Sequence, residues 1–117
     1  YLSEEDKGDS PSPEGASEAE EKKKVGENGT KIPGSKTTGK KGETERVDVE
    51  NPAPGKRDGD VHYHEPDNTK WRYDIESGQF VNPDPNNPTP APPRIQKLLE
   101  LEWVRKAIKK ALDILGE

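Results

Sequence analysis

A short stretch of alternating side chains, residues 60–74, constrains the fold more than any other part of the chain. Residues 60–65 and 70–74 alternate apolar and polar side chains on either side of a break at 66–69, which is typical of a β-hairpin. Because successive strand side chains point to opposite faces, we expect one packed face and one polar face. The packed face would carry Val61, Tyr63, Trp71 and Tyr73, and the polar face His62, His64, Lys70, Arg72 and Asp74.

Two further strands are predicted beside this hairpin. Residues 46–50 alternate and are stopped by Asn51-Pro52, which favours an edge strand because proline cannot donate to a strand ladder. Residues 79–81 follow a turn at 76–78 and predict a short strand that carries Phe80. We expect Trp71, Tyr73 and Phe80 in the core, with base stacking by an exposed ring as the alternative.

The C-terminal part predicts helix. Six prolines between residues 82 and 93 predict an extended connector that is neither helix nor interior strand. From Ile95 to Leu115 apolar residues recur at three- and four-residue spacing, with Pro93 suited to a first turn and Gly116 to a helix end. Residues 100–102 could break this helix. The fold class expected is α+β, a small antiparallel sheet of three to four short strands packed on one or two C-terminal helices.

The N-terminal part is too polar to form a core of its own. Residues 1–46 contain six clearly apolar side chains, too few to offset a backbone ordering cost of about 1–2 kcal/mol per residue. We therefore expect a long disordered N-terminal segment, with residues 1–45 a flexible linker or entry segment and residues 46–117 the folded domain. A domain of that size lies near the lower limit for a self-sufficient core.

Composition excludes several function classes. The net charge of -5 argues against a general nucleic-acid coat protein, although a nuclease can concentrate a few cations at its site. The absence of cysteine excludes disulfides, zinc fingers and thiol catalysis. With two histidines in the chain we expect no metal and no cofactor. No apolar run reaches the roughly 20 residues that span a bilayer. The absence of methionine and a first residue of Tyr1 suggest a fragment of a longer polypeptide.

The polar face of the hairpin carries the residue types that a metal-free ribonuclease uses. Such an enzyme needs a base for the ribose 2′-hydroxyl, an acid for the leaving oxygen and cations for the phosphate. We expect His62 to act as base or acid, with His64 or Asp74 as its counterpart. The cations predicted to hold the phosphate are Lys56, Arg57, Lys70 and Arg72. The alternative is an ordinary solvated strand face with cross-strand pairing.

These residues also carry a family resemblance. The segment 46–57, then His62-Tyr63, Lys70, Tyr73-Asp74, Gln96-Lys97 and the terminal segments 107–112 and 115–117, resembles the C-terminal toxin domains of bacterial polymorphic toxins. Ribonuclease domains of this kind end Rhs-type and contact-dependent growth inhibition proteins. The resemblance covers residues 46–117 and favours His62, Arg57 and Lys70 over His64.

The resemblance implies a function. It implies a ribonuclease that is secreted or displayed at the cell surface as part of a larger effector and that acts in the cytoplasm of a target bacterium. Its partners would be RNA, for example tRNA or rRNA, a cognate immunity protein, and an entry receptor or an activating protein in the target cell. The alternative is a non-enzymatic binding module that docks through its C-terminal amphipathic helix.

Overall fold

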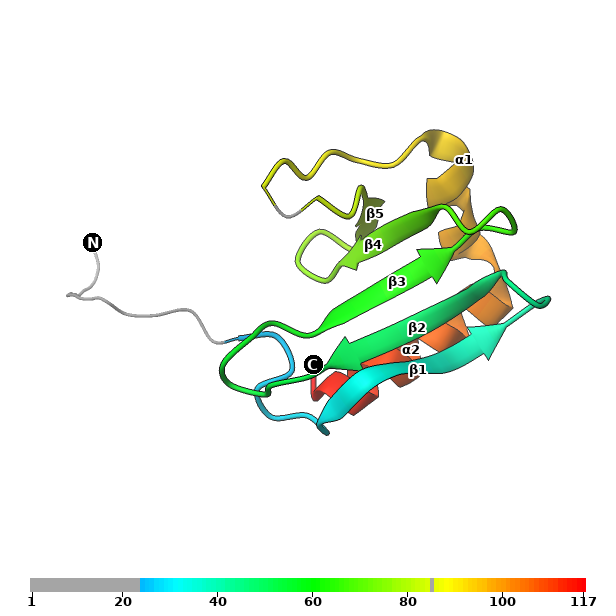
Figure 1. The fold of residues 1–117 in the computed structure, drawn as a ribbon. Helices are drawn as coiled ribbons and strands as arrows, with labels where there is room; N and C mark the ends of the chain where they lie inside the picture. Colours follow the sequence, from blue (N-terminus) through cyan, green and yellow to red (C-terminus); the bar gives the residue numbers. More distant parts are fainter. Residues whose placement is uncertain (1–23, 85) are drawn as a thin grey trace.

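A five-stranded antiparallel sheet followed by short helices makes up the fold (Figure 1). The structure, a computed structural model, describes residues 24–84 and 86–117. The strands pair in chain order and are β1 (Ile32–Lys40), β2 (Arg46–Asn51), β3 (Asp60–His64), β4 (Lys70–Asp74) and β5 (Gln79–Val81). The helical elements are α1 (Pro93–Gln96), the 3-10 turn η2 (Lys97–Glu100) and α2 (Glu102–Leu115). The predicted α+β class is therefore confirmed.

The sheet begins earlier in the chain than the sequence predicted. β1 lies inside the segment expected to be a linker and pairs with β2 from Ile32↔Asn51 to Lys40↔Arg46. The linker prediction is therefore wrong for the part that contains β1, and the interpretation of 46–50 as an edge strand is wrong because β2 lies between β1 and β3. Most side chains of β1 are exposed, so backbone pairing and not apolar burial defines it. The predictions for residues 1–23 lie outside the described residues.

The alternation predicted for the hairpin sets the core. Tyr63 lies opposite both Val47 and Trp71, so these side chains share one face of the sheet. Val61 and Tyr63 are buried, and Trp71 and Tyr73 are half-buried against the same cluster. Phe80 is fully buried, as expected for a core residue. The two named faces of the hairpin are therefore confirmed.

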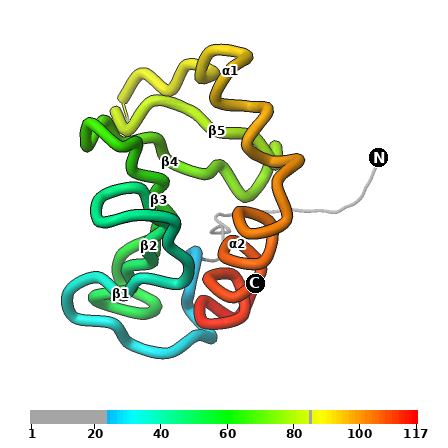
Figure 2. Tube along the Cα trace, turned by 90° about the vertical axis from the view of Figure 1, so that its right-hand side faces the viewer, coloured from blue at the N-terminus to red at the C-terminus, as the bar shows by residue number. Residues whose placement is uncertain are grey.

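Helix α2 covers this apolar face. It packs on β1, β2 and β3 along one side of the sheet (Figure 2). Its buried stripe consists of Val104, Ala107, Ile108, Ala111 and Leu115. Close approach to β1 depends on Gly39, because a Cβ atom there would lie 2.5 Å from the Cβ atom of Ala107.

The helix ends follow the sequence prediction. Pro93 is the first residue of α1, where its missing N–H costs nothing. Leu101 has extended backbone angles and separates η2 from α2 at the predicted break. Gly116 ends α2 with φ 72°, in the left-handed region that favours glycine. None of the described helices is long and apolar enough to cross a membrane.

The other half of the sheet is anchored to α1. The Gln96 side chain accepts a hydrogen bond from the Phe80 amide at 3.0 Å and donates one to the Phe80 carbonyl at 2.8 Å. The Glu65 carboxylate accepts hydrogen bonds from the Trp71 indole and from Arg94 at 2.7 Å each. The β3–β4 hairpin and β5 are therefore tied to α1, whereas β1 to β3 pack on α2.

Candidate active site

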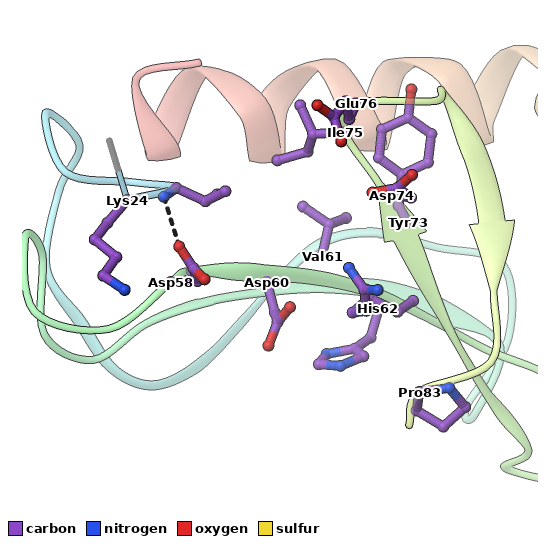
Figure 3. A pocket seen from close by; sticks show the side chains of 13 residues that line it. Lys24, Asp58, Asp60, Val61, His62, Tyr73, Asp74, Ile75, Glu76 and Pro83 are labelled. Atoms are coloured by element: carbon purple, nitrogen blue, oxygen red, sulfur yellow. Dashed lines mark hydrogen bonds between the residues drawn. The ribbon is translucent and has the colours of Figure 1, made fainter. Parts of the chain in front are cut away.

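A cavity opens where β3 and β4 diverge. β2 and β3 stay paired as far as Glu50↔Asp60, but the β3–β4 pairing stops at His62↔Arg72. The free ends of the two strands border a cavity of about 680 Å³, which Figure 3 shows from close by. Its walls are formed by Lys24, Val25, Asp58, Gly59, Asp60, Val61, His62, Arg72, Tyr73, Asp74, Ile75, Glu76 and Pro83.

His62 lies in a row of side chains that crosses the sheet on the face away from α2 and is polar from β1 to β4. The register places Thr37, Asp48, His62, Arg72 and Val81 opposite one another across the five strands. Residues opposite each other in an antiparallel pair project to the same face. Figure 3 shows Asp60 and His62 on one side of β3, whereas Val61 points toward α2. The predicted polar face therefore faces away from the core.

The His62 imidazole is half-buried beside two carboxylates. Its side chain is 16% exposed, and its Nδ1 atom lies 3.9 Å from a carboxylate oxygen of Glu50. Burial lowers the pKa of His62, because it penalises the charged imidazolium more than Asp60 and Glu50 stabilise it. A neutral imidazole at neutral pH is able to accept a proton.

Asp60 shares this face with His62 and was missed by the sequence reasoning. Burial raises the pKa of Asp60, and the neighbouring His62 and Arg72 oppose that shift. Within the described part of the chain, no hydrogen bond to its carboxylate contributes to the shift. A half-buried carboxyl group with a raised pKa is suited to carry a proton. The sequence contained a signal for Asp60, because it stands two residues before His62 and alternation along the strand places both on the same face.

Arg72 supplies a cation directly opposite His62. Its Nε atom is buried and has no hydrogen-bond partner among the described residues. A buried donor without a partner is costly, and a guanidinium group binds phosphate oxygens with charge-assisted hydrogen bonds. Because Arg72 lines the cavity opposite His62, its guanidinium group is placed to contact an anion held there.

His64 lies in a different environment from His62. It is 5% exposed, with Nε2 3.4 Å from an oxygen of Asp48 and Nδ1 3.1 Å from the side-chain oxygen of Asn68. Asp48 is also buried and accepts hydrogen bonds from Thr37 at 2.7 Å and from Arg46 at 2.9 Å. Both ring nitrogens of His64 are thus engaged in a buried polar network outside the cavity walls.

Of the other predicted site residues, one lines the cavity and three lie outside it. Asp74 lines the cavity, but its Oδ2 atom accepts a hydrogen bond from the Ser77 amide at 3.2 Å and so holds the turn before β5. Lys70 is exposed beside His64 and does not line the cavity. Lys56 and Arg57 are exposed in the turn after β2 and also lie outside its walls. Of the predicted set, the structure therefore brings together His62, Arg72 and Asp74.

Two further observations complete the site. Lys24, from the segment before β1, contributes a cation to the cavity wall that the sequence did not indicate. Within residues 24–84 and 86–117, no group of three or more histidine, aspartate or glutamate side chains is placed to hold a metal ion.

The fold and the cavity define a small α+β domain with a candidate acid–base site where its sheet splits. No protein-family model matches the chain, and neither a curated protein nor a solved structure matches it. The resemblance to polymorphic toxin domains therefore stays a prediction.

Proposed function

We propose that this chain cleaves RNA by metal-independent acid–base catalysis. The observation that carries the proposal is the meeting of His62, Asp60 and Arg72 at one cavity. A proton acceptor, a proton donor and a cation are the three groups that cleavage next to a ribose 2′-hydroxyl requires. The shifts of the pKa values of His62 and Asp60 favour the roles of base and acid.

The reaction assigns each group one role. His62 takes the proton of the 2′-hydroxyl, the 2′-oxygen forms a bond to phosphorus, and the bond from phosphorus to the 5′-oxygen breaks. Asp60 donates its proton to that leaving oxygen, and Arg72 stabilises the negative charge on the phosphorus oxygens. The products are a 2′,3′-cyclic phosphate and a 5′-hydroxyl. Proton exchange with water then restores the starting states of His62 and Asp60.

Asp60 is a better counterpart for His62 than the two residues predicted from the sequence. His64 is enclosed in the network with Asp48 and Asn68. Asp74 gives one carboxylate oxygen to the turn that precedes β5. We therefore assign His64 a positioning role within the sheet and Asp74 a role in shaping the cavity.

We propose further that the domain is an interbacterial toxin that a cognate immunity protein neutralises. The resemblance of residues 46–117 to polymorphic toxin domains supports this setting. The test is expression in a bacterium with and without the product of the adjacent downstream reading frame. Growth arrest that this product relieves would support the proposal, whereas normal growth of cells that contain folded, soluble domain would contradict it.

The alternative of a binding module that docks through its C-terminal helix receives no support from the fold. The apolar stripe of α2 is buried against the sheet. Among the described residues, Leu101 is the exposed large hydrophobic side chain, at 40%. The stripe is therefore already covered by the domain itself.

The decisive experiment is incubation of total bacterial RNA with the purified chain and EDTA. We expect discrete cleavage products, and a His62→Ala variant should cleave about 10²- to 10⁴-fold more slowly because it lacks the acid–base group. Lys106→Ala, on the exposed face of α2, is the control and should cleave like the wild type. Thermal unfolding of each variant checks the fold. RNA that stays intact at high protein concentration would refute the proposal.

A further inference from the structure

The cavity beside His62 is larger than an acid–base pair and a phosphate need. Its volume of about 680 Å³ lies in the range of sites that enclose small molecules. It extends from His62 and Asp60 between the separated strands toward Tyr73 and Ile75, which lie on the α2 side in Figure 3. We propose that this space is a nucleobase subsite that selects guanine, with Glu76 as the residue that recognises the base. The inference rests on the proposed ribonuclease function.

The walls suit a flat aromatic ligand. Tyr73 and Ile75, both half-buried, supply aromatic and apolar surface, and Pro83 is a further apolar wall residue, drawn on the His62 side of the cavity in Figure 3. The Tyr73 ring is fixed by an edge-on contact with Phe80, with ring centroids 5.8 Å apart. Stacking on an aromatic side chain tolerates every base, so it gives affinity without selectivity.

The charges in the walls favour the donor edge of a base over additional phosphates. Three carboxylates, from Asp58, Asp74 and Glu76, and the proton donor Asp60 face two cations, Lys24 and Arg72. Carboxylates repel phosphate and accept hydrogen bonds from N–H groups. Guanine presents its N1–H and N2 amino group side by side, which matches the two oxygens of one carboxylate. Adenine, cytosine and uracil lack such a pair of adjacent donors.

Glu76 is the carboxylate that is free for this task. Asp58 accepts a hydrogen bond from the Val25 amide at 2.9 Å, and Asp74 accepts one from the Ser77 amide at 3.2 Å. Asp60 acts as the acid in the proposed reaction. The Glu76 carboxylate is exposed at the turn between β4 and β5 and forms no hydrogen bond or ion pair with the described residues. Both of its oxygens are therefore available to a ligand.

The test uses DNA oligonucleotides with a single ribonucleotide, so that only one bond has a neighbouring 2′-hydroxyl. Four substrates carry guanosine, adenosine, cytidine or uridine at that position. We expect the guanosine substrate to be cut about tenfold to hundredfold faster than the others, which is the discrimination of a bidentate contact. Glu76→Gln should slow this substrate alone and abolish the preference. Glu43→Gln, at an exposed glutamate between β1 and β2, should leave it intact.

The outcomes separate this inference from the proposed function. Cleavage of total RNA combined with equal rates on the four substrates would overturn the inference and leave the function standing. A guanine preference that survives in Glu76→Gln would overturn the role of Glu76. Binding of guanosine 3′-monophosphate, measured by calorimetry against adenosine 3′-monophosphate, checks the subsite without turnover. Equal binding of the two nucleotides, or binding of neither, would also overturn the inference.

Discussion

The contact between Gly39 of β1 and Ala107 of α2 gives a sharp test of the fold. A Cβ atom at Gly39 would lie 2.5 Å from the Ala107 Cβ atom and 3.5 Å from its Cα atom. Two carbon atoms do not approach so closely, so Gly39→Ala must push β1 and α2 apart. Overpacking of this kind costs about 1–3 kcal/mol. Loss of glycine flexibility in the unfolded chain offsets about 0.4–1 kcal/mol of that cost.

The net destabilisation is measurable. We expect Gly39→Ala to lower the free energy of unfolding by about 1–2 kcal/mol, or the melting temperature by about 4–16 °C for a domain of this size. Urea unfolding followed by circular dichroism measures the change. Gly34→Ala is the matched control, because it lies in the same strand and its Cβ atom would meet nothing within 4 Å. This control should be as stable as the wild type or slightly more stable.

A double mutant separates the contact from strand propensity. Ala107→Gly alone should cost about 1 kcal/mol as a glycine inside a helix, yet it makes room for the new methyl group at residue 39. The double variant should therefore lose clearly less than the sum of the two single changes. Additive losses, or equal stability of Gly39→Ala and Gly34→Ala, would refute the packing of β1 on α2 and restore the interpretation of this segment as a linker.

Three further predictions concern pH and packing. RNA cleavage needs unprotonated His62, whose pKa burial lowers, and protonated Asp60, whose pKa burial raises, so the rate should pass through a maximum and fall at alkaline pH as Asp60 loses its proton. A rate that keeps rising to pH 9 would contradict these roles. The hydrogen bond from Arg94 lowers the pKa of Glu65 in the folded protein. The pair therefore stabilises the fold fully at pH values above 4.5, the pKa of Glu65 in the unfolded chain, and this stabilisation is lost as the pH falls through the lowered pKa. The urea midpoint of Arg94→Gln should accordingly lie below that of the wild type at pH 7 and approach it at pH 3. Leu115→Ala, at a fully buried position, should cost about 2–5 kcal/mol in urea unfolding, and a loss below 1 kcal/mol would contradict its place in the core.

The sequence revealed the elements whose side chains are buried in a periodic pattern. Strands β2 to β5 and helix α2 place apolar residues on one face, and the sequence alone shows this periodicity. β1 has no such pattern, because most of its side chains are exposed. Its place in the sheet depends on backbone pairing and on the small size of Gly39, and both become meaningful only when the opposing strand and helix are known.

The same division applies to the site. Alternation along β3 and β4 predicted that His62 and Arg72 share a face, and the strand register confirms it. Lys56 and Arg57 are predicted as phosphate-binding cations, and the family resemblance favours Arg57, but the turn after β2 places both outside the cavity walls. The burial of His64 depends on contacts with Asp48 in the neighbouring strand and could not be derived from local spacing.

The two anchors of the sheet explain why the cavity lies beside His62 and not beside His64. β1 to β3 are packed on α2, whereas β5 is tied to α1 through Gln96, so the two halves of the sheet follow different helices. The two halves meet at the β3–β4 pair. These strands are paired near His64, next to the hairpin turn, and their pairing stops after His62↔Arg72. His62 is thus held in place by strand pairing and also borders the cavity, whereas His64 does not line the cavity. A catalytic group needs both a fixed position and access to a ligand, and on this sheet the boundary between pairing and separation supplies them together.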